Sequence, residues 1–107
     1  MTTARTSIEI SAPDAHAAVT AGTGVVVDVR EDWEWSSGHA ADAKHISLYG
    51  LGARLKELPR DRSIFCICAS GNRSLSAAEY LRREGFDARS VAGGTAAWVL
   101  HRLPVEA

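Results

Sequence analysis

The sequence has few cysteines and no excess of charge of either sign, and each shortage excludes a class of protein. Only two of its 107 residues are cysteines, Cys66 and Cys68. Cysteines one residue apart on a strand rarely meet disulfide geometry, so we expect no disulfide framework. The 12 basic and 13 acidic residues leave a net charge of −1. That balance gives no general attraction to nucleic acid or to an anionic membrane.

Metal ligands and long apolar runs are also scarce. The single C-x-C pair lacks the second cysteine pair of a structural zinc site, and the four histidines show no ligand spacing. No stretch approaches the length of a membrane span, and the opening MTTARTSIEIS has no apolar signal core. We therefore expect a cytoplasmic protein with free thiols and without a metal, nucleic-acid or membrane partner.

The apolar runs predict one α/β domain. Residues 25–29 (VVVDV) and 63–68 (SIFCIC) are typical of parallel strands buried on both faces. A shorter strand is expected in SIEI at 7–10, and a last strand and turn in DARSVAGG at 87–94. Helices are expected at residues 11–22, 51–59, 74–85 and 95–103, with one helical turn around 33–35. Ser11 is the expected N-cap of the first helix, and Ser74 is the expected N-cap of the helix at 74–85.

Strands that alternate with helices in this way indicate βα units. We therefore predict a mainly parallel central sheet of about five strands with helices on both faces. The domain is expected to span residues 7–107, after a flexible N-terminus at residues 1–6.

Cys68 lies where the strand at 63–68 gives way to the turn ASGN and a helix. In a parallel sheet, the carboxyl ends of strands face helix N-termini, whose free N–H groups favour anions. Because Gly71 permits backbone angles that other residues resist, residues 69–73 would curl around the sulfur and favour its thiolate. Cys68 is thus the predicted nucleophile. Cys66, in mid-strand, is interpreted as a small core residue.

The segment around Cys68, CASGNRS, resembles the active-site loop of rhodanese-like sulfurtransferases. Three further segments resemble that family in the same order and spacing: VVVDVREDWEWSSGHA, LPRDRSIFCIC and GFDARSVAGGTAAW. Together the segments span about residues 24–98, which makes the resemblance more specific than a lone cysteine loop. The sequence departs from the family at a structural turn, where the family has G-H-I-x-G-A and I-P-L and this chain has GHAADA and ISL.

The resemblance implies a rhodanese-like fold and a double displacement that uses no metal or organic cofactor. The Cys68 thiolate would take the sulfane sulfur of thiosulfate or a persulfide. The Cys68 persulfide would then pass that sulfur to cyanide, a thiol or a sulfur-carrier protein. Loop N–H groups would hold the persulfide charge. Substrate binding is accordingly expected from Ala69, Ser70, Gly71, Asn72, Arg73 and Arg30.

Supporting roles are expected for the charged and polar residues beside the loop. Arg73 either binds donor anions or braces the loop by an ion pair with Asp28, which would be costly to bury unpaired. Arg30 is either a second anion contact or a surface arginine. Ser74 is expected to cap the helix, and His39 to brace a loop by hydrogen bonding. Three tryptophans are expected to pack in the core and the lid: Trp33, Trp35 and Trp98.

Two other functions use a similar framework. A Cdc25-like phosphatase or arsenate reductase has five residues between its cysteine and arginine, whereas four separate Cys68 from Arg73. The shorter loop should hold a sulfur atom and be too tight for a tetrahedral phosphate. A non-catalytic rhodanese-like module that binds partners is the other alternative, and the intact cysteine loop favours an enzyme.

Overall fold

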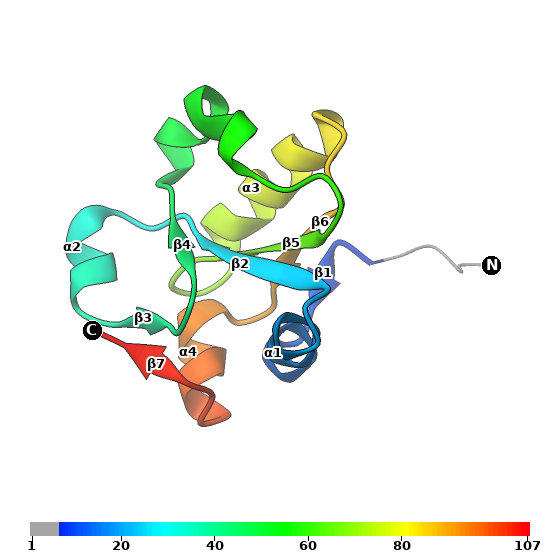
Figure 1. Ribbon diagram of the computed structural model, residues 1–107. Helices are drawn as coiled ribbons and strands as arrows, with labels where there is room; N and C mark the ends of the chain where they lie inside the picture. Colours follow the sequence, from blue (N-terminus) through cyan, green and yellow to red (C-terminus); the bar gives the residue numbers. More distant parts are fainter. Residues whose placement is uncertain (1–6) are drawn as a thin grey trace.

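The main sheet has five parallel strands, in the order β1-β6-β5-β2-β4 (Figure 1). The computed structural model describes residues 7–107, so the expected flexible N-terminus lies outside the described residues. The strands are β1 Glu9–Ile10, β2 Gly24–Asp28, β4 Lys44–His45, β5 Ser63–Ile67 and β6 Ala88–Val91. The predicted parallel sheet of about five strands is confirmed.

Helices cover both faces of this sheet (Figure 1). They are α1 Ala12–Thr20, α2 Asp32–Ser36, the 3-10 helix η1 Leu48–Glu57, α3 Asn72–Arg83 and α4 Gly94–Leu100. Helices α1 and α4 pack on one face, where Trp98 contacts the cluster that includes Val26 and Phe65. Helices α3 and η1 pack on the other, where Leu81 joins the cluster of Val27 and Cys66. Burial of each large apolar side chain stabilises the fold by about 1.5–3 kcal/mol.

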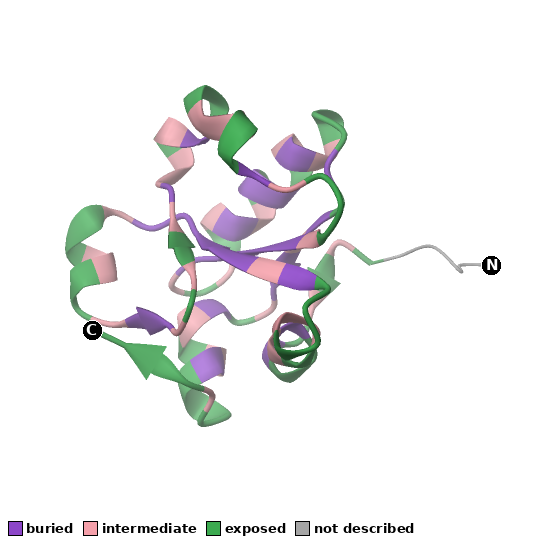
Figure 2. Ribbon diagram, in the orientation of Figure 1, coloured by how far each residue is buried: buried purple, intermediate pink, exposed green. Residues whose placement is uncertain are grey.

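A second, two-stranded sheet joins β3 (His39–Ala40) to β7 (Val105–Glu106) in antiparallel register. The sequence did not predict either strand, because two residues are too few to show alternation. Buried residues follow the main strands and the inner helix faces, whereas α2 and β7 are mostly exposed (Figure 2). Within residues 7–107, no helix has both the length and the apolar character to cross a bilayer.

Two helix starts show how local chemistry sets the boundaries. Ser11 caps α1 as predicted, because its Oγ accepts the N–H of Asp14 at 3.1 Å. The prediction that Ser74 caps the next helix is wrong, since α3 begins at Asn72 with Gly71 as its N-cap. Gly71 has φ +116°, a left-handed angle that turns the chain into the helix early. Ser74 therefore lies in the first turn of α3 and is fully buried.

Two further helices differ from the sequence-based expectation. The helix predicted at 51–59 is a 3-10 helix over Leu48–Glu57, with a kink at Arg54. The last helix, predicted at 95–103, spans Gly94–Leu100. Both elements keep their expected place in the chain order, so the positions of the strand ends around Cys68 are unaffected.

Candidate active site

Cys68 follows the last residue of β5, which lies between β6 and β2 in the sheet. Strands β2, β5 and β6 are parallel, so their carboxyl ends meet at one edge. The segments that follow them are α2, the turn Cys68–Gly71 and α4. The cysteine thus lies at the edge of the sheet where ligand sites of α/β folds occur.

Hydrogen-bond donors converge on the Cys68 sulfur. The N–H groups of Gly71 and Ser74 donate to Sγ at 3.1 and 3.3 Å. The thiol pairs with the Ser74 hydroxyl at 3.3 Å, and that hydroxyl pairs with Ser90 Oγ at 2.8 Å. Burial opposes ionisation, but the Ser74 hydroxyl and the N–H groups of Ser74, Gly71 and Ser70 together lower the pKa of Cys68 below its ordinary value. The arrangement therefore favours a thiolate.

The N-terminus of α4 holds the outer side of the cysteine loop. The Thr95 N–H and hydroxyl donate to the Cys68 carbonyl at 2.8 and 3.2 Å, and the Ala96 N–H donates to the Ala69 carbonyl at 3.3 Å. A Cβ at Gly94 would clash with the Cys68 carbonyl and lie 2.7 Å from that of Ala69. With its carbonyls bound to α4, the loop can aim its N–H groups at the sulfur.

Arg73 does not pair with Asp28, so that alternative from the sequence is wrong. Its Nη1 and Nη2 donate to the two carboxylate oxygens of Glu34 at 2.7 and 2.8 Å. Glu34 belongs to α2, which follows the neighbouring strand β2. The bound guanidinium lowers the pKa of Glu34 to about 2, and the carboxylate raises the pKa of Arg73. The pair ties the cysteine loop to α2.

Asp28 pairs with Arg30 instead. Arg30 Nη2 donates to Asp28 Oδ2 at 2.8 Å and to the Gly38 carbonyl at 2.7 Å. The side chain of Asp28 is fully buried, and only 6% of Arg30 is exposed. The alternative of a surface arginine is therefore wrong. This buried pair fixes the chain that leaves β2, and the role of Arg30 as an anion contact stays a prediction.

His39 braces the segment around α2 rather than the cysteine loop. Its Nδ1 is 2.9 Å from the Trp35 carbonyl, and its ring stacks on the Trp35 ring with centroids 3.4 Å apart. The Trp35 ring also stacks on the His45 ring, with centroids 4.8 Å apart. The expectation of core or lid packing is wrong for Trp33, which is 73% exposed because α2 turns it outward, whereas Trp98 is buried.

The remaining loop residues are small and uncharged. Ala69 and Gly71 are partly buried, and Ser70 and Asn72 are exposed. Their assignment to substrate binding stays a prediction. Cys66 is fully buried in the core, where burial raises its pKa to about 12.

Sequence reasoning missed three contributors to this site. Glu34 was noted only as part of a motif, and nothing local indicated that it binds a residue 39 positions away. The close approach of Gly94 to the cysteine loop had no local signal in the sequence. Ser90 had a signal, since a hydroxyl within a buried strand needs a partner.

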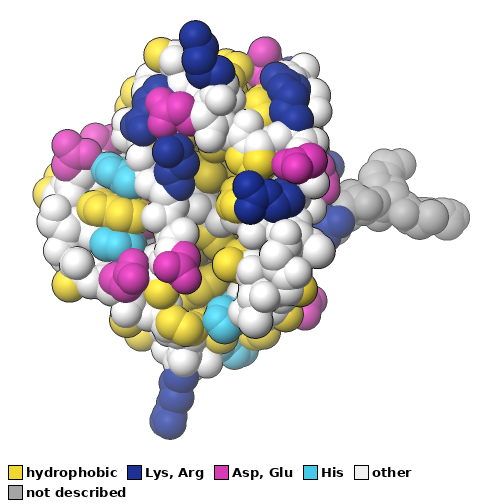
Figure 3. All heavy atoms as spheres, in the orientation of Figure 1, with side chains coloured by type: hydrophobic (Ala, Val, Ile, Leu, Met, Phe, Trp, Pro, Cys, Tyr) yellow, Lys and Arg dark blue, Asp and Glu magenta, His cyan; other side chains and the backbone are white. Residues whose placement is uncertain are grey.

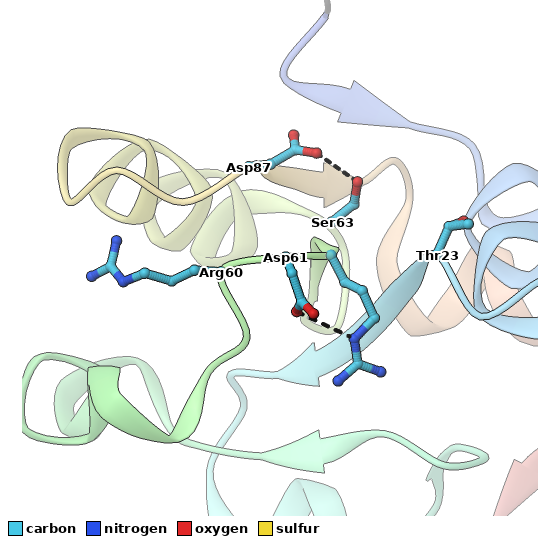
Figure 4. Close-up of a pocket in the computed structure, with 6 residues that line it drawn as sticks. Thr23, Arg60, Asp61, Ser63 and Asp87 are labelled. Carbon is cyan, nitrogen blue, oxygen red and sulfur yellow. Dashed lines mark hydrogen bonds and ion pairs between the residues drawn. The ribbon is translucent and has the colours of Figure 1, made fainter.

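A separate hollow of about 260 Å³ lies at the opposite end of the main sheet, where β2 and β5 begin (Figure 4). It is lined by Thr23, Arg60, Asp61, Arg62, Ser63 and Asp87. Four of its polar groups pair with each other: Ser63 donates to Asp87 at 2.6 Å, and Arg62 lies 3.8 Å from Asp61. We assign it no function, because ligands of parallel sheets bind at the carboxyl ends of the strands.

Known proteins share this fold and this sequence pattern. The sequence profile of the family described as Rhodanese-like domain matches residues 11–101. A rhodanese-related protein from Thermoplasma volcanium is similar, with a TM-score of 0.85 and 34% identity over 94% of this chain and 98% of that one. A rhodanese-like domain protein from Staphylococcus aureus has a TM-score of 0.78 and 31% identity over 86% of this chain and 91% of that one.

Proposed function

We propose that this chain, which belongs to the rhodanese-like domain family, is a sulfurtransferase that carries a sulfane sulfur on Cys68. The observation that carries the proposal is the set of donors around the Cys68 sulfur, which lowers the pKa of the thiol. A thiolate is the nucleophilic form of cysteine. A core cysteine with no chemical role would need no such donors.

The first half-reaction charges the cysteine. The Cys68 thiolate attacks the outer sulfur of thiosulfate, a new S–S bond forms, and sulfite leaves with the electron pair of the broken S–S bond. A persulfide donor reacts in the same way and releases a thiolate. The product is a Cys68 persulfide anion, whose charge the loop N–H groups can hold as an oxyanion hole does.

The second half-reaction discharges it. An acceptor such as cyanide, a thiol or a sulfur-carrier protein attacks the outer sulfur, and the Cys68 thiolate leaves. The carried group is sulfur itself, so neither step requires an organic cofactor or a metal. Only 1% of Cys68 is exposed, and a donor or acceptor must therefore reach it with a slender atom such as a terminal sulfur.

A phosphatase of the Cdc25 type is less well supported. That chemistry needs an arginine fork free to bind phosphate oxygens, and the fork of Arg73 is bound to Glu34. The loop N–H groups of Gly71 and Ser74 already point at sulfur. A purely partner-binding module is disfavoured for another reason, since it would not need the lowered pKa of Cys68.

Mass spectrometry after exposure to thiosulfate or a persulfide tests the proposal. We expect the wild type to gain the mass of one sulfur atom, which cyanide or dithiothreitol removes. Cys68→Ser should gain none and should show no sulfur transfer. Cys66→Ala is the matched control, because its thiol lies in the core, and it should keep both the adduct and turnover. Sulfur transfer by the Cys68→Ser variant would contradict the mechanism.

A further inference from the structure

The two arginines beside the cysteine loop are both bound within the protein. The guanidinium of Arg73 is held by both oxygens of Glu34, whose side chain is only 12% exposed. The guanidinium of Arg30 is held by Asp28 and is almost fully buried. A donor anion would have to compete with a carboxylate for either fork, because the planar pair of donors matches only one pair of oxygens at a time.

The surroundings of Arg73 are acidic rather than basic. Glu31, Asp32 and Glu34 lie at the start of α2, and the loop residues 69–72 carry no charge. Figure 3 shows acidic and histidine side chains gathered over the α2 side of the molecule. Of these carboxylates, Glu34 and Glu31 act on the charge of Arg73, and like charges near a binding site select against an anion of higher charge.

We propose that Glu34 determines the donor specificity of this site. By binding Arg73, it disfavours the thiosulfate dianion relative to a monoanionic sulfane donor such as a persulfide or a thiosulfonate. The inference rests on the proposed function of Cys68. Glu34 does not contact the sulfur in the structure, and it acts through the arginine that follows the loop.

Two donors with the same reacting sulfur and different charge can test this role. Thiosulfate is a dianion, and attack by the Cys68 thiolate releases sulfite. Methanethiosulfonate is a monoanion, and the same attack on its terminal sulfur releases methanesulfinate. Each reaction forms one S–S bond, breaks one, and leaves the same Cys68 persulfide. The ratio of kcat/KM for thiosulfate to kcat/KM for methanethiosulfonate therefore isolates the effect of the additional charge.

Glu34→Gln should raise this ratio about tenfold, which corresponds to about 1.4 kcal/mol. The rise should come mainly from a lower KM for thiosulfate, because the substitution frees the Arg73 guanidinium to bind the oxygens of the donor. Asp32→Asn is the matched control. It removes the same charge from the same helix, but its carboxylate is 99% exposed and is not bound to Arg73. It should change the ratio by less than about twofold.

The double variant Glu34→Gln/Arg73→Gln should return the ratio to the wild-type value or below, because no fork remains to be freed. Three results would overturn the inference: an unchanged ratio in Glu34→Gln, equal losses on both donors, or the same rise in Asp32→Asn. Each of these leaves the proposed function intact as long as the wild type transfers sulfur through Cys68. Absence of any Cys68-dependent turnover in the wild type would instead overturn both.

Discussion

At the scale of single residues, Cys66 in β5 and Cys68 just after its end belong to the same core cluster and differ in what surrounds their sulfur atoms. Cys66 pairs with Val27 across the sheet and is buried among apolar residues, which raises its pKa to about 12. Cys68 lies one step past the strand end, where donors from α3 reach its sulfur and lower its pKa. A shift of two positions along the chain thus separates a thiol with a raised pKa from one with a lowered pKa.

Ser74→Ala should raise the pKa of Cys68, because it removes a hydroxyl that favours the charged form. Because a hydrogen bond to a charged group is stronger than one to a neutral group, the acidic limb of the pH profile of kcat/KM should move to higher pH. The pH dependence of sulfur transfer and the thiolate's ultraviolet absorbance both measure this shift. Ser76→Ala, on the exposed side of α3, is the control and should leave the limb in place. An unchanged limb in Ser74→Ala would show that the N–H groups alone set the pKa.

Some residue roles could be predicted from the sequence because they depend on neighbours in the chain. The position of Cys68 at a strand end, next to a glycine turn, follows from local pattern and is confirmed by the structure. The partner of Arg73 could not be predicted, since it depends on where α2 lies. The pairing of Asp28 with Arg30 is local, but sequence alone did not decide whether the arginine turns inward or outward.

At the scale of elements, the cysteine loop depends on the start of α4 as much as on its own sequence. Gly94→Ala should disrupt the loop, because Gly94 has φ +59° and an added Cβ would press on the carbonyls of Cys68 and Ala69. A displacement of about 1 Å in a reacting group can cost about 10²-fold in rate, so we expect sulfur transfer to fall by more than tenfold. Steady-state kinetics and thermal unfolding measure the two effects.

Gly50→Ala is the control for this change. Its added Cβ would lie 3.5 Å from Ser47 Oγ, an ordinary contact, and its backbone has no left-handed angle. It should keep wild-type turnover. If Gly94→Ala transferred sulfur as fast as the wild type, α4 would have no part in shaping the loop.

The elements that could be predicted from the sequence are those long enough to show a pattern. The strands β2 and β5 carry apolar runs, and α1 has both a cap and a proline in its first turn. The pairing of β3 with β7 could not be predicted, because it joins two-residue strands from distant parts of the chain. The N-cap of α3 lies three residues before the predicted one, since Gly71 caps the helix without a side chain.

At the scale of the whole molecule, the main sheet divides the core into two clusters, one on each face. The cluster under α3 includes both cysteines, so the candidate site and the stability of the fold share one apolar layer. A thiol that stays protonated in the folded state and ionises in the unfolded chain makes stability depend on pH. Cys66 is such a group.

The sign of this dependence follows from the raised pKa of Cys66. Its contribution to stability is fully present below the unfolded pKa of about 8.5. It is lost as the pH rises toward the folded pKa of about 12. The loss approaches about 1.4 kcal/mol per pH unit, since one proton is bound in the folded state and released in the unfolded one.

Cys66→Ala should therefore reverse its effect on stability between pH 7 and pH 10. At pH 7 it should cost about 1 kcal/mol through the small cavity it leaves. At pH 10 the protein that keeps Cys66 should have lost about 2 kcal/mol of its free energy of unfolding relative to neutral pH. The alanine variant should then be the more stable of the two proteins. Urea unfolding of both proteins in a Cys68→Ser background measures the difference with only one thiol titrating. Other groups titrate equally in the two proteins and cancel. A difference that does not change with pH would mean that Cys66 ionises as readily in the folded protein as in the unfolded chain, and that its core is open to water.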